Sequence, residues 1–291
     1  MQDADSLAKI IFMKKFLLPL FAILLFTACQ KEISMDKASE KIAGADENKQ
    51  AKILVCHYDA ATGISKTIEI NASALTGHLA HGDLQGDCST VLTTICDQDW
   101  MVKNLDVDHY RNGDPIPQVT DHSVWTGLRT GAWCYYKNDP ANGAIYGKLY
   151  NWYAVNDPRG LAPQGWHVPT DAEWTTLENC LGGWQIAGGK IKSSGTIETR
   201  TGLWLSPNTG ATNSSGFSGL PGGVRPGDGA IDFASINRGS YWYSSTEFST
   251  DRAWSRQTFF DGNYLQSCHE QNIPQPCSTK WIGMSVRCTR D

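Results

Sequence analysis

A short apolar segment that ends at a cysteine constrains this chain more than any other feature. Residues 13–15 (Met-Lys-Lys) supply positive charge, residues 16–26 form an apolar run, and Thr27-Ala28-Cys29 closes it. A charged start, a short apolar run and small residues at its end are typical of a secretory signal, and the run is too short to span a bilayer. The sequence therefore predicts export, and with it a fold that contains disulfides.

The cysteine directly after the small residues makes this segment resemble a bacterial lipoprotein signal, in which Cys29 becomes the lipidated first residue. Residues 1–28 are then the signal peptide, with Met13 as the expected start because two aspartates lie among residues 1–12. Residues 30–32 (Gln-Lys-Glu) resemble the surface-export signals of Bacteroidetes lipoproteins. We expect acyl chains to hold the protein on the outer membrane or the cell surface. An ordinary signal peptide or a retained anchor helix is the alternative.

Charge and composition narrow the class of protein further. Removal of residues 1–28, which carry three lysines and two aspartates, changes the net charge from −5 to −6. That balance, without any cluster of Lys and Arg, argues against nucleic acid as a partner. The 28 glycines and 11 tryptophans indicate a loop-rich, aromatic-rich extracellular domain rather than a helical bundle. The chain is long enough for one sizeable core and a small additional module.

The sequence divides into three parts after the signal. Residues 29–51 are polar and lack aromatics, which predicts a lipidated, flexible tether. Residues 52–89 form a small module rich in Cys and His. Residues 91–291 are predicted to be one α+β domain of short strands, turns and one main helix.

The small module contains candidate metal ligands. Its first half predicts a hairpin that turns at Thr62-Gly63. His78 and His81 lie one helical turn apart, and Cys56 and Cys88 flank them, with His57 and Asp83 nearby. Such a Cys/His set can hold zinc in a tetrahedral shell.

The alternative for this module is a disulfide between Cys56 and Cys88, with the histidines capping the helix and bonding locally. Export favours this alternative. Nine cysteines without lipidated Cys29 leave eight, an even number that suits disulfides but allows 105 pairings.

The helix of residues 170–181 is the clearest local structure. Thr170 is a predicted N-cap, and Glu173 completes a capping box. Trp174, Leu177 and Leu181 form one apolar stripe, and two glycines follow as a stop signal.

Several motifs, in order, resemble the Fibrobacter succinogenes major paralogous domain over about residues 91–291. They are ICDQDWMVKNLDVDHYRNGDPIP, YGKLYNWYAV, GWHVPTDAEW, GFSGLPGGVR, YWYSSTE and GMSVRC. The resemblance implies the C-type lectin-like fold of formylglycine-generating enzymes, with a twisted, mostly antiparallel sheet and long loops. It also implies one disulfide, Cys180–Cys288, because lectin-like domains tie the main helix to the last strand. Cys268 and Cys277 then close a local loop and Cys96 with Cys134 remains, beside the Cys56–Cys88 pairing of the small module.

Binding is the function that we expect of the large domain, with a glycan or a surface protein as the ligand. Aromatic and polar residues near the C-terminus suit sugar stacking or protein contact. Alternation along a strand puts Trp254 and Arg256 on one face and Ser255, Gln257 and Phe259 on the other. The candidate ligand-binding residues are Trp254, Arg256, Gln257, Phe259, Phe260 and Tyr264.

We weigh other functions below binding. The resemblance allows a formylglycine-generating type of enzyme that uses Cys268 and Cys277, but the sequence favours a structural bridge between them and no enzyme activity. A purely structural envelope protein is a further alternative. No cofactor is certain. Zinc in the small module is one candidate, and calcium at acid pairs such as Asp139 with Asp157, or Asp228 with Asp232, is another.

Overall fold

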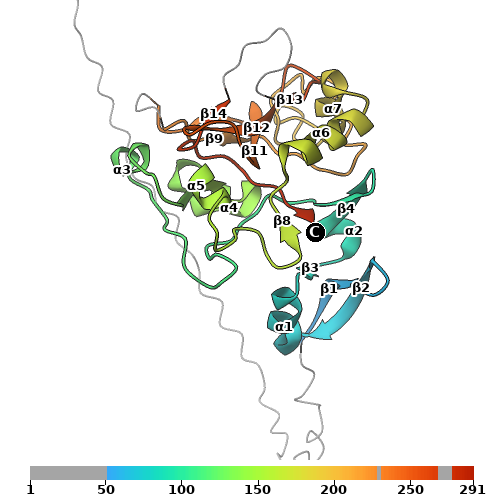
Figure 1. The fold of residues 1–291 in the computed structure, drawn as a ribbon. Helices are drawn as coiled ribbons and strands as arrows, with labels where there is room; N and C mark the ends of the chain where they lie inside the picture. Colours follow the sequence, from blue (N-terminus) through green and yellow to red (C-terminus); the bar gives the residue numbers. More distant parts are fainter. Residues whose placement is uncertain (1–50, 228–230, 268–276) are drawn as a thin grey trace, which may run out of the picture. The chain divides into compact units, whose positions relative to one another are not determined.

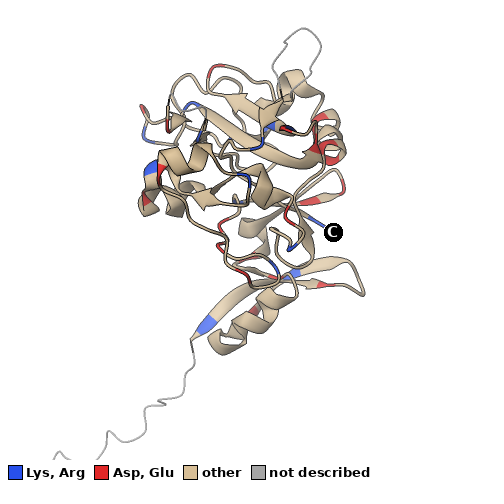
Figure 2. Ribbon diagram, turned by 60° about the vertical axis from the view of Figure 1, so that its left-hand side comes forward, with Lys and Arg blue, Asp and Glu red and all other residues tan. Residues whose placement is uncertain are grey.

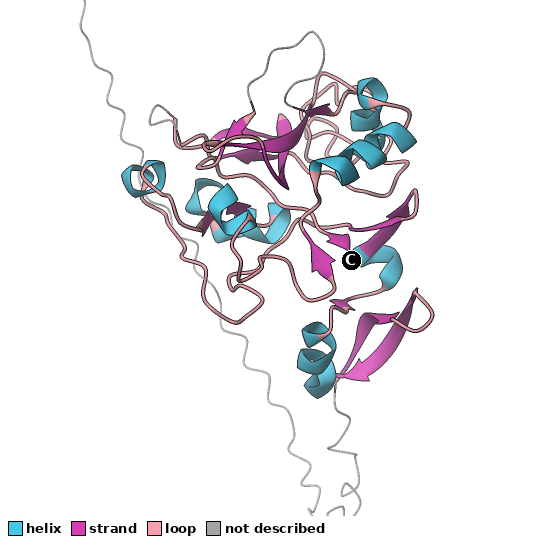
Figure 3. Cartoon of the chain, viewed as in Figure 1, coloured by secondary structure: helices cyan, strands magenta, loops and turns pink. Residues whose placement is uncertain are grey.

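The strands and helices of this protein are short and are joined by long loops (Figures 1 and 3). The computed structural model describes residues 51–227, 231–267 and 277–291. The strands are β1 (Lys52–Asp59), β2 (Ile64–Asn71), β3 (Leu84–Gln85), β4 (Leu92–Ile95), β5 (Gln98–Met101), β6 (Trp133–Cys134), β7 (Leu149–Tyr150), β8 (Trp166–His167), β9 (Gly222–Val224), β10 (Ala234–Ile236), β11 (Gly239–Glu247), β12 (Arg252–Phe259), β13 (Gln266–Ser267), β14 (Ser278–Thr279) and β15 (Thr289–Arg290). The helices are α1 (Leu75–Ala80), α2 (Cys88–Val91), α3 (His122–Thr126), α4 (Pro140–Tyr146), α5 (Trp152–Val155), α6 (Asp171–Cys180) and α7 (Trp184–Ile191), with 3-10 turns η1 (Ala72–Ala74) and η2 (Tyr136–Asn138).

These elements confirm the predicted α+β class but not a single continuous sheet. Residues Gln50–Asp291 form one compact unit that contains several small antiparallel sheets. The strand orders are β2-β1-β3, β4-β5-β15-β8 and β11-β12-β13, with β14 also paired to β12, and β9-β10 and β6-β7 are separate pairs. Lys and Arg are spread over the described ribbon (Figure 2).

Within the described residues, no helix combines the length and the apolar character needed to cross a membrane. The predicted signal peptide, Cys29 and nearly all of the predicted tether lie outside those residues.

The first hairpin turns where the sequence predicted. Strands β1 and β2 pair in register from Lys52 with Asn71 to Asp59 with Ile64. Gly63 has φ +70° in the turn, a conformation that glycine adopts without strain. Strand β3 adds to the free edge of β1, which places the segment after α1 beside the first strand.

The predicted main helix is α6, and its local signals are confirmed. Thr170 and Glu173 form the capping box, and Trp174, Leu177 and Leu181 are buried. Trp174 packs into an aromatic core with Trp100, Phe217 and Trp242, whose ring centroids lie 4.9 to 6.0 Å from its own.

Helix α7 was not predicted, because Gly188-Gly189 lowers the helix propensity of its sequence. The structure shows what the glycines provide. A Cβ at Gly188 would collide with the Tyr264 carbonyl, and the Gly189 amide donates to the Asn263 carbonyl at 2.8 Å. Close packing of the α7 backbone against the segment of residues 263–264, rather than intrinsic helix propensity, therefore explains this helix.

Two of the predicted disulfides are wrong. Cys180 pairs with Cys96, not with Cys288, so the pairing of Cys96 with Cys134 is wrong as well. Cys180 ends α6 and bonds to Cys96 in the turn between β4 and β5, whereas Cys288 belongs to a hydrophobic core cluster that contains neither of them. Cys134 and Cys288 are buried free thiols. The predicted Cys268–Cys277 bond involves Cys268, which lies outside the described residues.

Candidate functional site

Strand β12 divides the predicted ligand residues between two faces. Alternate side chains point to opposite sides of a strand. Arg256 is buried on the side of α6, whereas Ser255 and Gln257 line a cavity on the other side. The same alternation groups Trp254 with Arg256 and Phe259 with Gln257.

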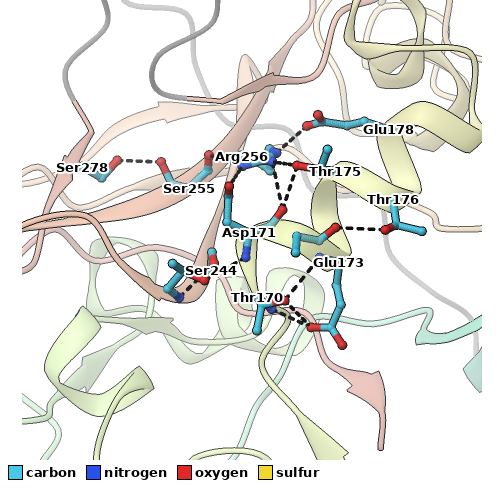
Figure 4. Close-up of polar contacts among 12 residues, drawn as sticks. Thr170, Asp171, Glu173, Thr175, Thr176, Glu178, Ser244, Ser255, Arg256 and Ser278 are labelled. Carbon is cyan, nitrogen blue, oxygen red and sulfur yellow. Dashed lines mark hydrogen bonds and ion pairs between the residues drawn. The ribbon is translucent and has the colours of Figure 1, made fainter.

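Arg256 is not placed to bind a ligand, which corrects the prediction. Its side chain is 2% exposed and lies between β12 and α6 (Figure 4). The guanidinium donates to Asp171 Oδ1 at 2.6 Å and to a carboxylate oxygen of Glu178. It also donates to Thr175 Oγ1 at 3.2 Å. The guanidinium of Arg256 therefore bonds within the protein, and the side chain joins strand β12 to helix α6.

The predicted aromatic residues are half-buried and do not form one open platform. The Trp254 ring contacts Phe248 with centroids 5.4 Å apart. Phe259 contacts Tyr264 at 6.3 Å, while the Arg238 guanidinium lies 5.8 Å from the Phe260 ring. Trp254 therefore belongs to a different group from Phe259 and Tyr264.

A cavity of about 240 Å³ opens on the face of β12 that carries Gln257. Gln257 is the one predicted ligand residue in its wall. Strands β13 and β14 pair with β12 in the same sheet and add Gln266, Ser278 and Thr279 to the lining. The lining residues are Val224, Pro226, Tyr241, Arg252, Ser255, Gln257, Gln266, Cys277, Ser278, Thr279, Ile282 and Met284.

The polar groups in this wall bond mostly to one another. Gln257 Nε2 lies 3.4 Å from Gln266 Oε1, and the Ser255 and Ser278 hydroxyls lie 2.8 Å apart. Arg252 donates to the Cys277 carbonyl at 2.6 Å. Sequence reasoning missed Gln266, since it meets Gln257 only through the register of β12 with β13.

A second cluster lies in the small module, where three histidines surround one carboxylate. His57 Nδ1, His78 Nδ1 and His81 Nε2 lie 2.8, 2.7 and 3.2 Å from Asp83 Oδ2. The Tyr58 amide donates to the other oxygen, Asp83 Oδ1, at 2.9 Å. Burial alone would raise the pKa of Asp83, but the bonds from Tyr58, His57 and His78 outweigh it and lower that pKa. Asp83 is therefore an anion at neutral pH.

The structure brings together only part of the predicted ligand set. Cys56 and Cys88 form a disulfide with each other, the pairing that export favoured, so their thiolates are not available to a metal. His78 and His81 do converge, but with His57 and Asp83 in place of the cysteines.

The acid pairs suggested for calcium serve other purposes. Asp139 caps α4 through the Ala141 amide, and Asp157 pairs with Arg159 at 2.9 Å. Asp232 accepts from Arg225 at 2.8 Å. Its suggested partner, residue 228, lies outside the described residues.

The free thiols of the described residues do not suit catalysis. Burial raises the pKa of both Cys134 and Cys288 to about 12, so neither forms a thiolate at neutral pH. The enzyme hypothesis built on Cys268 and Cys277 stays a prediction, because Cys268 lies outside the described residues.

The cavity and the histidine cluster thus lie in an α+β unit with several small antiparallel sheets. The model of the Fibrobacter succinogenes major domain matches residues 93–290, well over half of the chain. The chain therefore belongs to this family, a group of surface-type proteins of unknown function without an assigned enzyme activity. No curated protein and no solved structure gives a significant match.

Proposed function

We propose that the protein is a lipoprotein held on the outer membrane or the cell surface through Cys29, and that its lectin-like C-terminal domain binds a glycan. The cavity beside β12 is the observation that carries the proposal. Family membership supports a surface-type protein, and the acidic net charge of −5 argues against nucleic acid.

The chemistry of the cavity wall suits an uncharged ligand with many hydroxyls. Apart from Arg252, its polar side chains are amides and hydroxyls, which both donate and accept hydrogen bonds. Sugar hydroxyls also donate and accept, so they can form hydrogen bonds with these amides and hydroxyls. Arg252 is the one cationic side chain among the described lining residues, so the wall offers little positive charge to a strongly anionic ligand.

A row of aromatic rings in mutual contact begins at this cavity. Tyr241 lines it and contacts Phe259 with centroids 5.6 Å apart, and Phe259 contacts Tyr264. Burial raises the pKa of Tyr241, so its hydroxyl stays neutral. A row of half-buried rings beside amides is suited to stacking against sugars.

The test is a glycan-array and cell-surface binding screen of soluble residues 30–291, which contain the whole compact unit. It is run with calcium and again after chelation. We expect a saturable glycan signal that Gln257→Ala and Gln266→Ala each weaken by about fivefold, since each removes about 1 kcal/mol of hydrogen bonding.

Gln85→Ala is the matched control, because Gln85 is exposed in β3 and does not line the cavity. No glycan signal from folded protein, or equal loss in the control, contradicts the proposal. Binding to a protein only would point to a surface protein as ligand, and no binding at all would favour a structural envelope role.

A further inference from the structure

Four metal-binding side chains meet at one point of the small module, independently of the cavity beside β12. His57 comes from β1, His78 from α1, and His81 and Asp83 from the segment that follows α1. Their ligand atoms all lie within 4.8 Å of one another. His57 is 21 or more positions away from the other three residues in the sequence, and the pairing of β3 with β1 brings it to them.

Ordinary hydrogen bonding accounts poorly for this arrangement. A carboxylate oxygen offers about two lone-pair sites, yet three imidazole nitrogens face Asp83 Oδ2. The Asp83 side chain is 1% exposed, and the ring centroids lie 5.3 to 5.8 Å apart. A small cation between the rings and the carboxylate would satisfy all four groups at once.

The distances are close to those of a tetrahedral zinc shell. Zinc bonds of about 2.0–2.1 Å place neighbouring ligand atoms about 3.3 Å apart. The three separations from Asp83 Oδ2, 2.7 to 3.2 Å, are already near this value. All four ligand atoms lie within 4.8 Å of one another. Rotation of the imidazole rings, above all that of His81, which is 53% exposed, can close the remaining gaps.

Packing against the large domain holds the segment that carries two of the ligands. The Gly82 carbonyl, between His81 and Asp83, accepts from the Trp166 indole at 2.7 Å. Gly82 has φ +95°, and a Cβ there would collide with the Gln164 carbonyl. The Cys56–Cys88 disulfide fixes the neighbouring residue of His57. The ligands are therefore placed before any metal arrives, which lowers the ordering cost of binding.

We propose that His57, His78, His81 and Asp83 form a zinc-binding site. Imidazole and carboxylate suit a borderline ion such as Zn²⁺, whereas Ca²⁺ takes oxygen ligands almost alone. To bind, each neutral imidazole presents the lone pair of its inward nitrogen and keeps its proton on the outward one. Zinc then replaces the hydrogen bonds to Asp83 without net loss of protons from neutral histidines.

The experiment uses residues 30–291 purified without a histidine tag, stripped with chelator and titrated with Zn²⁺ in a calorimeter. We expect about one Zn²⁺ per chain, and with Co²⁺ as a probe the visible absorption of a tetrahedral site. His81→Ala should weaken Zn²⁺ binding by at least tenfold, since even the loss of a residue that only supports a metal ligand costs about tenfold.

His109→Ala is the matched control, because His109 is exposed and contacts Asp108 rather than the cluster. His81→Ala is preferred to changes at Asp83, since its exposed side chain can be removed with the least effect on folding. Melting in chelator checks that each variant folds. Absence of Zn²⁺ binding, or equal affinity in His81→Ala and His109→Ala, overturns the site. Glycan binding by His81→Ala reports on the β12 cavity separately.

Discussion

Arg256, with a side chain only 2% exposed, joins strand β12 to helix α6 through the carboxylates of Asp171 and Glu178. Buried ion pairs contribute little net stability over apolar residues of the same size, but removal of one partner leaves the other charge uncompensated. Glu178, with a side chain 7% exposed, would be that charge.

Arg256→Met should therefore lower the free energy of unfolding by about 3–5 kcal/mol. Urea unfolding followed by tryptophan fluorescence measures it. Arg200→Met is the control, because Arg200 is exposed, and its change should stay within about 0.5 kcal/mol. An Arg256 variant as stable as the control would show that α6 and β12 do not depend on this contact.

Helix α6 is held at its start by local bonds as well as by its buried stripe. The Thr170 hydroxyl accepts from the Glu173 amide, and the Glu173 carboxylate accepts from the Thr170 amide at 2.7 Å. Figure 4 shows both residues at the first turn, close to the Asp171 contact with Arg256.

Thr170→Ala should cost about 1 kcal/mol of stability, since it leaves the Glu173 amide without its capping acceptor. Thr176→Ala makes the same chemical change in mid-helix, where the hydroxyl bonds only to the Ala172 carbonyl and is exposed. We expect melting temperature to fall clearly for the first variant and little for the second. Equal falls would mean that the cap contributes nothing specific.

Local signals account for what the sequence could predict at this scale. The capping box and apolar stripe define α6, and a glycine turn defines the hairpin of β1 and β2, because each depends on neighbouring residues. The partner of Cys180 depends on where the end of α6 lies in space. The resemblance to lectin-like domains could not show this and gave the wrong cysteine. Likewise, alternation identified the two faces of β12 but not which one faces α6. His57 and Asp83 meet His78 only after β3 pairs with β1.

Sheet β4-β5-β15-β8 connects distant parts of the chain. Thr289 pairs with both Trp100 and His167. Beside this junction, the His167 ring lies between Glu173 Oε1 and Asp291 Oδ1, each at 2.8 Å. Burial alone would lower the pKa of His167, but the two carboxylates outweigh it and raise that pKa above 6.5.

A raised pKa makes the stabilisation by His167 depend on pH. The contribution is fully present below the unfolded pKa of 6.5 and is lost as pH rises through the higher folded pKa. His167→Gln should thus melt well below the wild type at pH 5.5 and close to it at pH 8.5. The control is His109→Gln, at an exposed pair. A difference between wild type and His167→Gln that does not change with pH contradicts this account.

The place of β15 in its sheet also has a consequence for folding during synthesis. Every chain leaves the ribosome from its N-terminal side, and β15 follows all other described strands. Strands β5 and β8 both pair with β15, so neither pairing can form before β15 is synthesised. Pairings between strands far apart in the sequence form slowly. During synthesis the sheet therefore has two open edges until residues 289–290 emerge, and the nascent protein needs protection from association over that whole interval.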